Sequence, residues 1–307
     1  MRTILVASGT SNTGSLLVQT LSASGKANVR ALTRNLESEA AKKLAGLPNV
    51  TLVKGDFGDV ASLKSALSGV DRAYLVAQPG DETQFDNEAA FLQAAKDAGI
   101  QGTVRVSTCQ CLISLDTPCV YARCHAKLEQ WSKDNDARVC DISPNMFMSN
   151  LYWQLAEIKS ASTFTLPCPA ATKHKFGMID PRDVAGAAEA ILMSDDAKFA
   201  EFMDARHQNV AGPELTDYEQ QLAALSEATG KVISAKTVAP EEYAAMFQAA
   251  GLSKLMAESF TLTVQTLAGE VEPRRPHADE TSPLLAGIWQ PKYTVKAWAK
   301  DNAEAFK

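Results

Sequence analysis

Small and polar residues fill the segment Ala7-Ser-Gly-Thr-Ser-Asn-Thr-Gly14, which directly follows the short apolar run Thr3–Ala7. A glycine-containing turn between a first strand and a helix lets the backbone approach a pyrophosphate, and the helix N-terminus supplies positive potential. Glycine at every third position would occupy 8, 11 and 14, where this chain has Ser8, Ser11 and Gly14. The segment predicts a dinucleotide phosphate site, although an ordinary turn that caps a helix fits the octapeptide equally well. The residues predicted to bind the phosphates are Ser8, Gly9, Thr10, Ser11, Asn12, Thr13 and Gly14.

The end of the second expected strand, Ala31-Leu-Thr-Arg-Asn35, indicates which dinucleotide would bind. NAD-binding domains place an acidic residue there to accept hydrogen bonds from the ribose, whereas a cation accommodates the additional phosphate of NADP. This strand end has no acid, and Arg34 can pair bidentately with a phosphate. We therefore predict NADP(H) as the cofactor. The alternative is an arginine that only faces solvent.

The elements that must position these residues follow a regular alternation. Short apolar, β-branched runs alternate with amphipathic stretches up to about residue 143, a pattern typical of parallel βαβ units. The expected strands are 3–7, 28–32, 50–53, 72–76, 103–107 and 138–142, and the expected helices are 13–22, 38–44, 60–67, 87–98 and 122–133. The fold class is thus α/β, a Rossmann-type doubly wound parallel sheet.

Beyond residue 145 helices dominate, with expected N-termini at Pro181, Thr216 and Pro240. We predict a dinucleotide-binding domain over residues 1–155. Residues 156–307 are expected to form a smaller, mostly helical substrate lobe that is partly interwoven with the sheet.

Composition narrows the classes of partner. The 307 residues are 46% hydrophobic and 21% charged, which is typical of a globular protein. The formal net charge is −6 and the chain has no basic run, so nucleic acid is not an expected partner. The first apolar run is too short for a signal peptide or a membrane span. Six cysteines without secretory context favour ordinary thiols in the cytoplasm, and the C-x-C spacing of Cys109 and Cys111 is not that of a zinc site. We expect no metal and a monomer or homodimer.

Several segments in register resemble the NmrA-like atypical short-chain dehydrogenases. Besides the N-terminal turn, they are Val29-Arg-Ala-Leu-Thr-Arg34, Lys54-Gly-Asp-Phe57, His125-Ala-Lys-Leu-Glu129, Ser143-Pro-Asn-Met-Phe-Met-Ser-Asn150 and Phe176-Gly-Met-Ile-Asp-Pro-Arg-Asp-Val184. The similarity extends from Met1 to about Leu267. This family includes NADPH-dependent quinone reductases, a triphenylmethane reductase and nonenzymatic redox-sensing regulators.

The resemblance also implies sites. Asp56 and Phe57 would lie along the adenine, Val76, Ala77 and Gln78 beside the ribose and nicotinamide, and Asn145, Met146 and Phe147 beneath the nicotinamide and substrate. Short-chain dehydrogenases use a serine, a tyrosine and a lysine. The corresponding residues here are Ser107, Tyr121 and, in the lysine position, His125, which are the predicted catalytic residues. Glu129, one helical turn on, can hydrogen-bond His125, which would orient the imidazole and raise its pKa. The alternative is a pair on the helix surface with no catalytic role.

Candidates for an apolar pocket wall are Tyr152, Trp153, Phe176, Met178, Met246, Phe247, Met256 and Phe260.

Three hypotheses follow. The first is an NADPH-dependent oxidoreductase that reduces a quinone, enone or other small carbonyl substrate, with the proton from Tyr121, His125 or water. The second is a nonenzymatic NADP(H)-binding regulator that acts through a protein partner. The third is a degenerate fold in which the serine-substituted loop binds no nucleotide.

Overall fold

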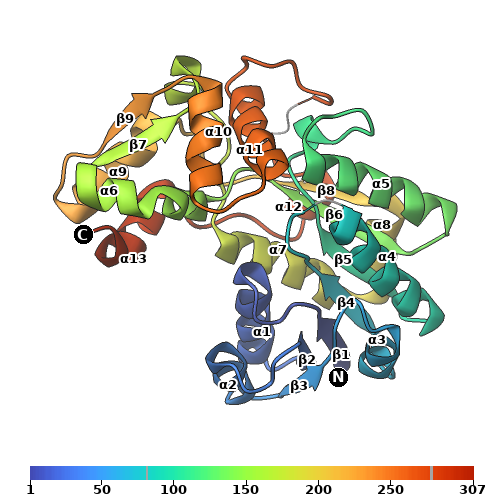
Figure 1. Cartoon of the computed structure of the whole chain (residues 1–307). Coiled ribbons are helices and arrows are strands. Elements are labelled where there is room, and N and C mark those ends of the chain that lie inside the picture. The colour runs from blue at the N-terminus through green and yellow to red at the C-terminus, as the bar shows by residue number, and fades with distance from the viewer. Residues whose placement is uncertain (81, 277–278) are drawn as a thin grey trace.

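The computed structural model describes residues 1–80, 82–276 and 279–307, and these residues form one seven-stranded parallel sheet beside a smaller lobe (Figure 1). In spatial order the strands of the sheet are β3 (Val50–Lys54), β2 (Ala27–Thr33), β1 (Arg2–Val6), β4 (Arg72–Leu75), β5 (Gly102–Val106), β6 (Val139–Pro144) and β8 (His207–Val210). All neighbouring strands are parallel. The predicted doubly wound Rossmann-type sheet is confirmed.

Alternation along β1 explains how both faces of the sheet become buried. Ile4 and Val6 face one hydrophobic cluster and Leu5 faces another, as expected because successive side chains of a strand point to opposite faces. The helices on the first face are α1 (Asn12–Ser24), α2 (Glu39–Ala45), α7 (Pro181–Met193) and α8 (Asp196–Ala205). Those on the second face are α3 (Val60–Leu67), α4 (Glu82–Asp97) and α5 (Val120–Asp134).

The smaller lobe is mostly helical and has its own core. Its two parallel strands are β7 (Thr163–Leu166) and β9 (Ser234–Thr237). Its helices are α6 (Leu155–Ala161), α9 (Tyr218–Thr229), α10 (Pro240–Ala249), α11 (Lys254–Leu267) and α13 (Val295–Phe306). Shorter elements are the 3-10 turns η1 (Gln110–Leu112), η2 (Met148–Gln154) and η3 (Pro169–Thr172) and the helix α12 (Pro283–Ala286). In Figure 1 this lobe rises above the sheet, and α11 lies near α5.

The chain crosses between the two parts more than once, because β8, α7 and α8 follow residue 155 yet belong to the sheet layer. Asp183 of α7 accepts hydrogen bonds from the backbone N–H groups of Lys292 and Tyr293, which fixes the segment before α13. One predicted helix start is wrong. The sequence predicts an N-terminus at Thr216, but α9 begins two residues later, at Tyr218, and its capping box is formed by Asp217 with Gln220. In the described parts of the chain, no helix is both long and apolar enough to span a membrane.

Candidate functional site

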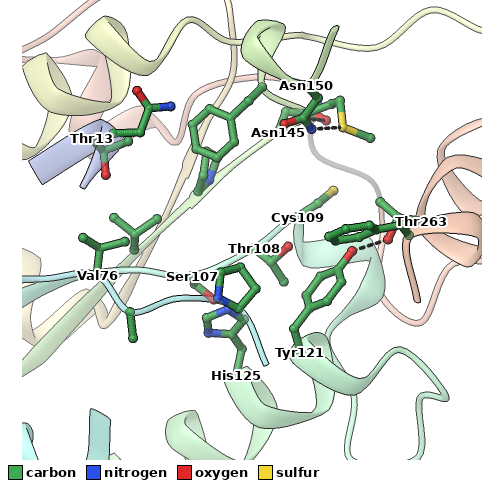
Figure 2. A pocket seen from close by; sticks show the side chains of 18 of the residues that line it. Thr13, Val76, Ser107, Thr108, Cys109, Tyr121, His125, Asn145, Asn150 and Thr263 are labelled. Carbon is green, nitrogen blue, oxygen red and sulfur yellow. Dashed lines mark hydrogen bonds between the residues drawn. The ribbon is translucent and has the colours of Figure 1, made fainter. Parts of the chain in front are cut away.

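A cavity of about 240 Å³ lies at the carboxyl ends of the strands, next to the point where the strand order reverses between β1 and β4. Ligands of open α/β sheets bind in this crevice. Its walls come from the start of α1 and from the carboxyl ends of β4, β5 and β6 and the segments that follow them, together with α4, α5, η2 and α11 (Figure 2). The site therefore lies between the sheet and the smaller lobe. Predicted cofactor residues in its wall are Asn12, Thr13, Val76, Ala77, Asn145, Met146 and Phe147.

The loop after β1 has the tight geometry that a dinucleotide fingerprint requires. Ser8 adopts a left-handed backbone conformation with φ 55°, a region that glycine usually occupies. A Cβ on Gly9 would lie 2.9 Å from the Cβ of Ala31, and a Cβ on Gly14 would lie 2.4 Å from the carbonyl oxygen of Ser8. The two glycines are thus required for close packing, while serine takes the turn position at a conformational cost.

The N-terminus of α1 leaves backbone donors for an anion. Ser11 is the N-cap, and its hydroxyl accepts a hydrogen bond from the N–H of Gly14 at 3.2 Å. Within the described residues, the N–H groups of Thr10, Asn12 and Thr13 have no acceptor. Unpaired N–H groups at the start of a helix form an anion site, because their partial positive charges add to the helix dipole. The serine-substituted loop therefore fits a pyrophosphate.

The strand order aligns the other predicted cofactor residues with this loop. Arg34 is exposed just beyond β2, and in the described chain its guanidinium has no ion pair or hydrogen bond. Asp56, beyond β3, accepts from the N–H of Gly58, and Phe57 packs edge-on against Phe91. Gln78, beyond β4, is exposed and lies outside the cavity wall. An extended ligand can thus run from Arg34 across the loop into the cavity.

Ser107 places an unsatisfied hydroxyl in the cavity. It follows β5, is 7% exposed, and its backbone N–H donates to the carbonyl of Ile142. Among the described atoms, its Oγ has no hydrogen-bond partner. A buried hydroxyl without a partner costs about 1–3 kcal/mol, so this group is expected to bind a ligand or a water molecule.

The hydroxyl of Tyr121 is hydrogen-bonded to Thr263 in the smaller lobe. The Oγ1 of Thr263 in α11 donates to the carbonyl of Ser259, so it accepts the hydrogen bond from the Tyr121 hydroxyl (Figure 2). Burial, together with the neighbouring Cys119, raises the pKa of Tyr121 well above its ordinary value. The phenol is therefore neutral, and its O–H donates to Thr263 rather than to a ligand in the cavity.

The expected pair between His125 and Glu129 is wrong. Glu129 binds Arg275 instead, with its two carboxylate oxygens 2.8 and 3.2 Å from the guanidinium. The imidazole of His125 is 5% exposed, and its Nδ1 lies 2.8 Å from Nη1 of Arg105. Burial and the charge of Arg105 hold the pKa of His125 well below its ordinary value, which is opposite to the expected direction. Position 125 faces inward, whereas Glu129 lies over the loop that carries Arg275.

Only part of the predicted apolar wall reaches the cavity. Trp153 and Phe260 do, with their rings stacked 4.6 Å apart, whereas Tyr152 stacks on Phe306 and Phe176 packs against Tyr218 in the lobe core. Met178, Met246, Phe247 and Met256 are also absent from the wall. Residues that the sequence did not single out but that line the cavity are Pro79, Gln84, Val106, Thr108, Cys109, Pro144, Asn150, Thr263 and Leu267.

The six cysteines are buried and in thiol form. Cys109 and Cys111 lie close together, with 3.0 Å between their sulfur atoms, and Cys109 reaches the cavity wall. Within residues 1–80, 82–276 and 279–307, no three His, Cys, Asp or Glu side chains are gathered as a metal site would need.

Comparison with known proteins decides the family. The NmrA-like family matches residues 1–284. The chain belongs to the NmrA-like family. This NmrA-like protein is 26% identical to an NAD(P)H azoreductase of Xenophilus azovorans over 99% of both chains. The structure of the NADPH-dependent quinone oxidoreductase QOR2 from Escherichia coli, complexed with NADPH, is similar with a TM-score of 0.75, 20% identity, and 97% and 99% of the two chains covered. NmrA, a negative transcriptional regulator in complex with NAD, has a TM-score of 0.73 at 16% identity, with 98% and 94% covered.

Proposed function

We propose that this NmrA-like protein is an NADPH-dependent oxidoreductase that reduces a quinone, an enone or another small carbonyl compound. The observation that carries the proposal is the unsatisfied Ser107 hydroxyl, because it lies in the same cavity as Asn12 and Thr13 at the start of α1. One element of the cavity thus fits a cofactor phosphate, and another fits a substrate oxygen.

The preference for NADPH rests on Arg34 and on the absence of an acid after β2. Arg34 directly follows β2, the strand next to β1 in the sheet, and a guanidinium at this position can bind the phosphate that distinguishes NADP from NAD. Bound NADPH would supply a hydride. The fit of the loop to an anion also argues against a degenerate fold that binds no nucleotide.

The chain contributes orientation more than acid catalysis. Tyr121 is neutral and donates to Thr263, so we assign it to the cavity wall and take water as the source of the proton. Reduction of a quinone or conjugated carbonyl tolerates this arrangement, because the product anion is already stabilised and placement of the hydride acceptor carries much of the barrier. Ser107 would bind the substrate oxygen.

The same lack of a proton donor favours a second candidate function. A nonenzymatic regulator that binds NADP(H) and acts through a protein partner needs the cofactor site but no acid, and the similarity to NmrA is consistent with it. Turnover separates the two functions.

The test combines binding and turnover. NADPH and NADH are titrated into the protein while tryptophan fluorescence is followed, and then quinones and enones are added while oxidation of the reduced nicotinamide is measured. Reductase activity predicts tight NADPH binding with turnover of at least one acceptor. Binding without turnover of any acceptor indicates the regulator, and no binding refutes both functions.

Arg34→Glu tests the cofactor assignment. Loss of a bidentate phosphate contact and gain of repulsion predict a rise in the Kd for NADPH of at least about 10-fold, with little change for NADH. Lys26→Glu is the matched control, because it introduces the same charge change at the opposite end of β2. Equal weakening of NADPH and NADH by Arg34→Glu would contradict the assignment.

A further inference from the structure

Beneath the cavity, three buried polar side chains from three elements contact Arg105, which belongs to a fourth element. Arg105 belongs to β5, two residues before Ser107, and is fully buried. Its Nε and Nη2 donate to the two carboxylate oxygens of Asp141 at 2.7 and 2.6 Å. Its Nη1 donates to Glu88 at 3.0 Å and approaches Nδ1 of His125 at 2.8 Å. The guanidinium thus holds a carboxylate of β6, a carboxylate of α4 and the imidazole of α5 in fixed positions.

This contact determines which nitrogen of His125 carries the proton. A guanidinium can only donate, so Nδ1 of His125 must accept, and a neutral imidazole then carries its hydrogen on Nε2. The Nε2 of His125 lies 3.3 Å from Nε2 of Gln84. That amide is oriented by Gly80, whose N–H donates to its oxygen, and by Glu88, which accepts from its nitrogen. Among the described residues, the Nε2–H of His125 therefore has no acceptor, and its ring lines the cavity.

The surroundings of His125 also decide its charge. The polar groups near His125 are Gln84 and Glu88 of α4, Arg105 of β5 and Tyr121 of its own helix. The carboxylate of Asp141 in β6 accepts two hydrogen bonds from Arg105. Protonation at Nδ1 would place a second positive charge against the guanidinium, and both side chains are buried. The imidazole therefore stays neutral at the pH values at which enzymes of this kind work, and it serves as a hydrogen-bond donor rather than as an acid.

We propose that Arg105 is a positioning residue that fixes His125 with its Nε2–H toward the cavity, where it and the Ser107 hydroxyl form a two-donor site for a substrate oxygen. The ligand class is a carbonyl or quinone oxygen that becomes anionic when the neighbouring carbon, or the conjugated ring, accepts a hydride. Two electrons and the hydride hydrogen enter the acceptor, the carbonyl π bond breaks, and water protonates the oxygen anion. This assignment rests on the proposed reductase function, but the state of His125 can be measured without turnover.

The first experiment uses two-dimensional NMR of the protein labelled with ¹⁵N in its histidine rings. The chain has four histidines, and the His125 signals are identified by their loss in His125→Gln. We expect a neutral Nε2–H pattern that does not titrate between pH 5.5 and 8. A protonated ring at pH 6, or an Nδ1–H pattern, would overturn the proposal.

The role of Arg105 is tested in Arg105→Lys, which keeps the charge. A single ammonium cannot serve Asp141 and the imidazole together, so we expect His125 to gain an Nδ1–H population and to titrate between pH 5 and 7. Circular dichroism verifies that this variant is folded. An unchanged NMR pattern in the folded variant would remove Arg105 from the assignment, and if the variant does not fold, the wild-type pattern decides.

Kinetics test the two-donor site. His125→Leu and Ser107→Ala should each lower kcat about 100-fold with the Kd for NADPH unchanged, because each removes one donor to a developing oxyanion. His125→Gln, whose amide can donate from a similar position, should recover most of the loss of His125→Leu, and wild-type kcat/KM should be flat from pH 5.5 to 8. Equal losses in the Gln and Leu variants would overturn the donor role. If no acceptor is turned over, the proposed function fails, and the NMR pattern still decides the state of His125.

Discussion

Replacement of Ser8 by glycine should stabilise this protein. Ser8 has φ 55°, and a non-glycine residue costs about 1–2 kcal/mol in the left-handed region. Its side chain makes no hydrogen bond within the described residues, so none is lost on substitution. Glycine recovers the conformational cost but loses about 0.5–1 kcal/mol through the greater entropy of the unfolded chain. We therefore expect the free energy of unfolding to rise by about 0.5 kcal/mol in Ser8→Gly.

The assay is urea unfolding followed by tryptophan fluorescence, with NADPH titration of each folded variant. Asn49→Gly is the matched control, because Asn49 is exposed, has φ 57° and lies away from the cavity. Asparagine tolerates the left-handed region better than serine, so its gain should be smaller and its effect on NADPH binding nil. Ser8→Val should be destabilising and should weaken NADPH binding, because a β-branched residue fits this conformation poorly.

The other serine of the loop should respond in the opposite direction. Ser11 has an ordinary φ of −73° and caps α1 through its hydroxyl. Ser11→Ala removes that cap and should lower the free energy of unfolding by about 1 kcal/mol. The reasoning would be refuted if Ser8→Gly lowered the free energy of unfolding as much as Ser11→Ala does, because the side chain of Ser8 would then stabilise the loop.

Three further predictions concern the polar residues around the cavity. The pKa of His125 is depressed by burial and by Arg105, so below about pH 6.5 the unfolded chain takes up a proton that the folded protein does not. Between pH 7.5 and 5.5 in urea titrations, the free energy of unfolding of wild type should therefore fall by about 1.4 kcal/mol more than that of His125→Gln, and an equal fall in the two proteins would contradict this. Tyr121→Phe should lower the free energy of unfolding by about 1 kcal/mol but leave kcat within about threefold, because the phenol donates to Thr263; a 100-fold loss of kcat would restore it as the proton donor. Arg275→Met should leave the His125 NMR pattern unchanged, since Glu129 does not contact the imidazole, and a shift of that pattern would show that the two are coupled.

Much of the sheet was predictable because its signals are local. The apolar runs and the helical periods between them placed β1 to β6 and α1 to α5 within a few residues, and Pro181 marked the start of α7. The glycines of the first loop were also interpretable, since the need for no side chain at Gly14 follows from helix and strand packing. The lobe was less predictable, because its cavity residues come from α11 and η2, and nothing local distinguishes Phe260 from Phe247.

The sequence by itself determined that this chain would form a doubly wound sheet with a polar loop at its first turn, because alternation of strand and helix patterns and the sizes of loop residues are properties of neighbouring positions. The resemblance to short-chain dehydrogenases singled out Ser107, Tyr121 and His125 as catalytic candidates, and the structure brings the three together in one cavity. Only the tertiary structure decided what each of them can do. The hydroxyl of Tyr121 donates a hydrogen bond to Thr263, and Arg105 rather than Glu129 contacts His125. The Ser107 hydroxyl has no partner among the described atoms. Hydrogen-bond partners and burial depend on elements far apart in the sequence, so local patterns could not show them.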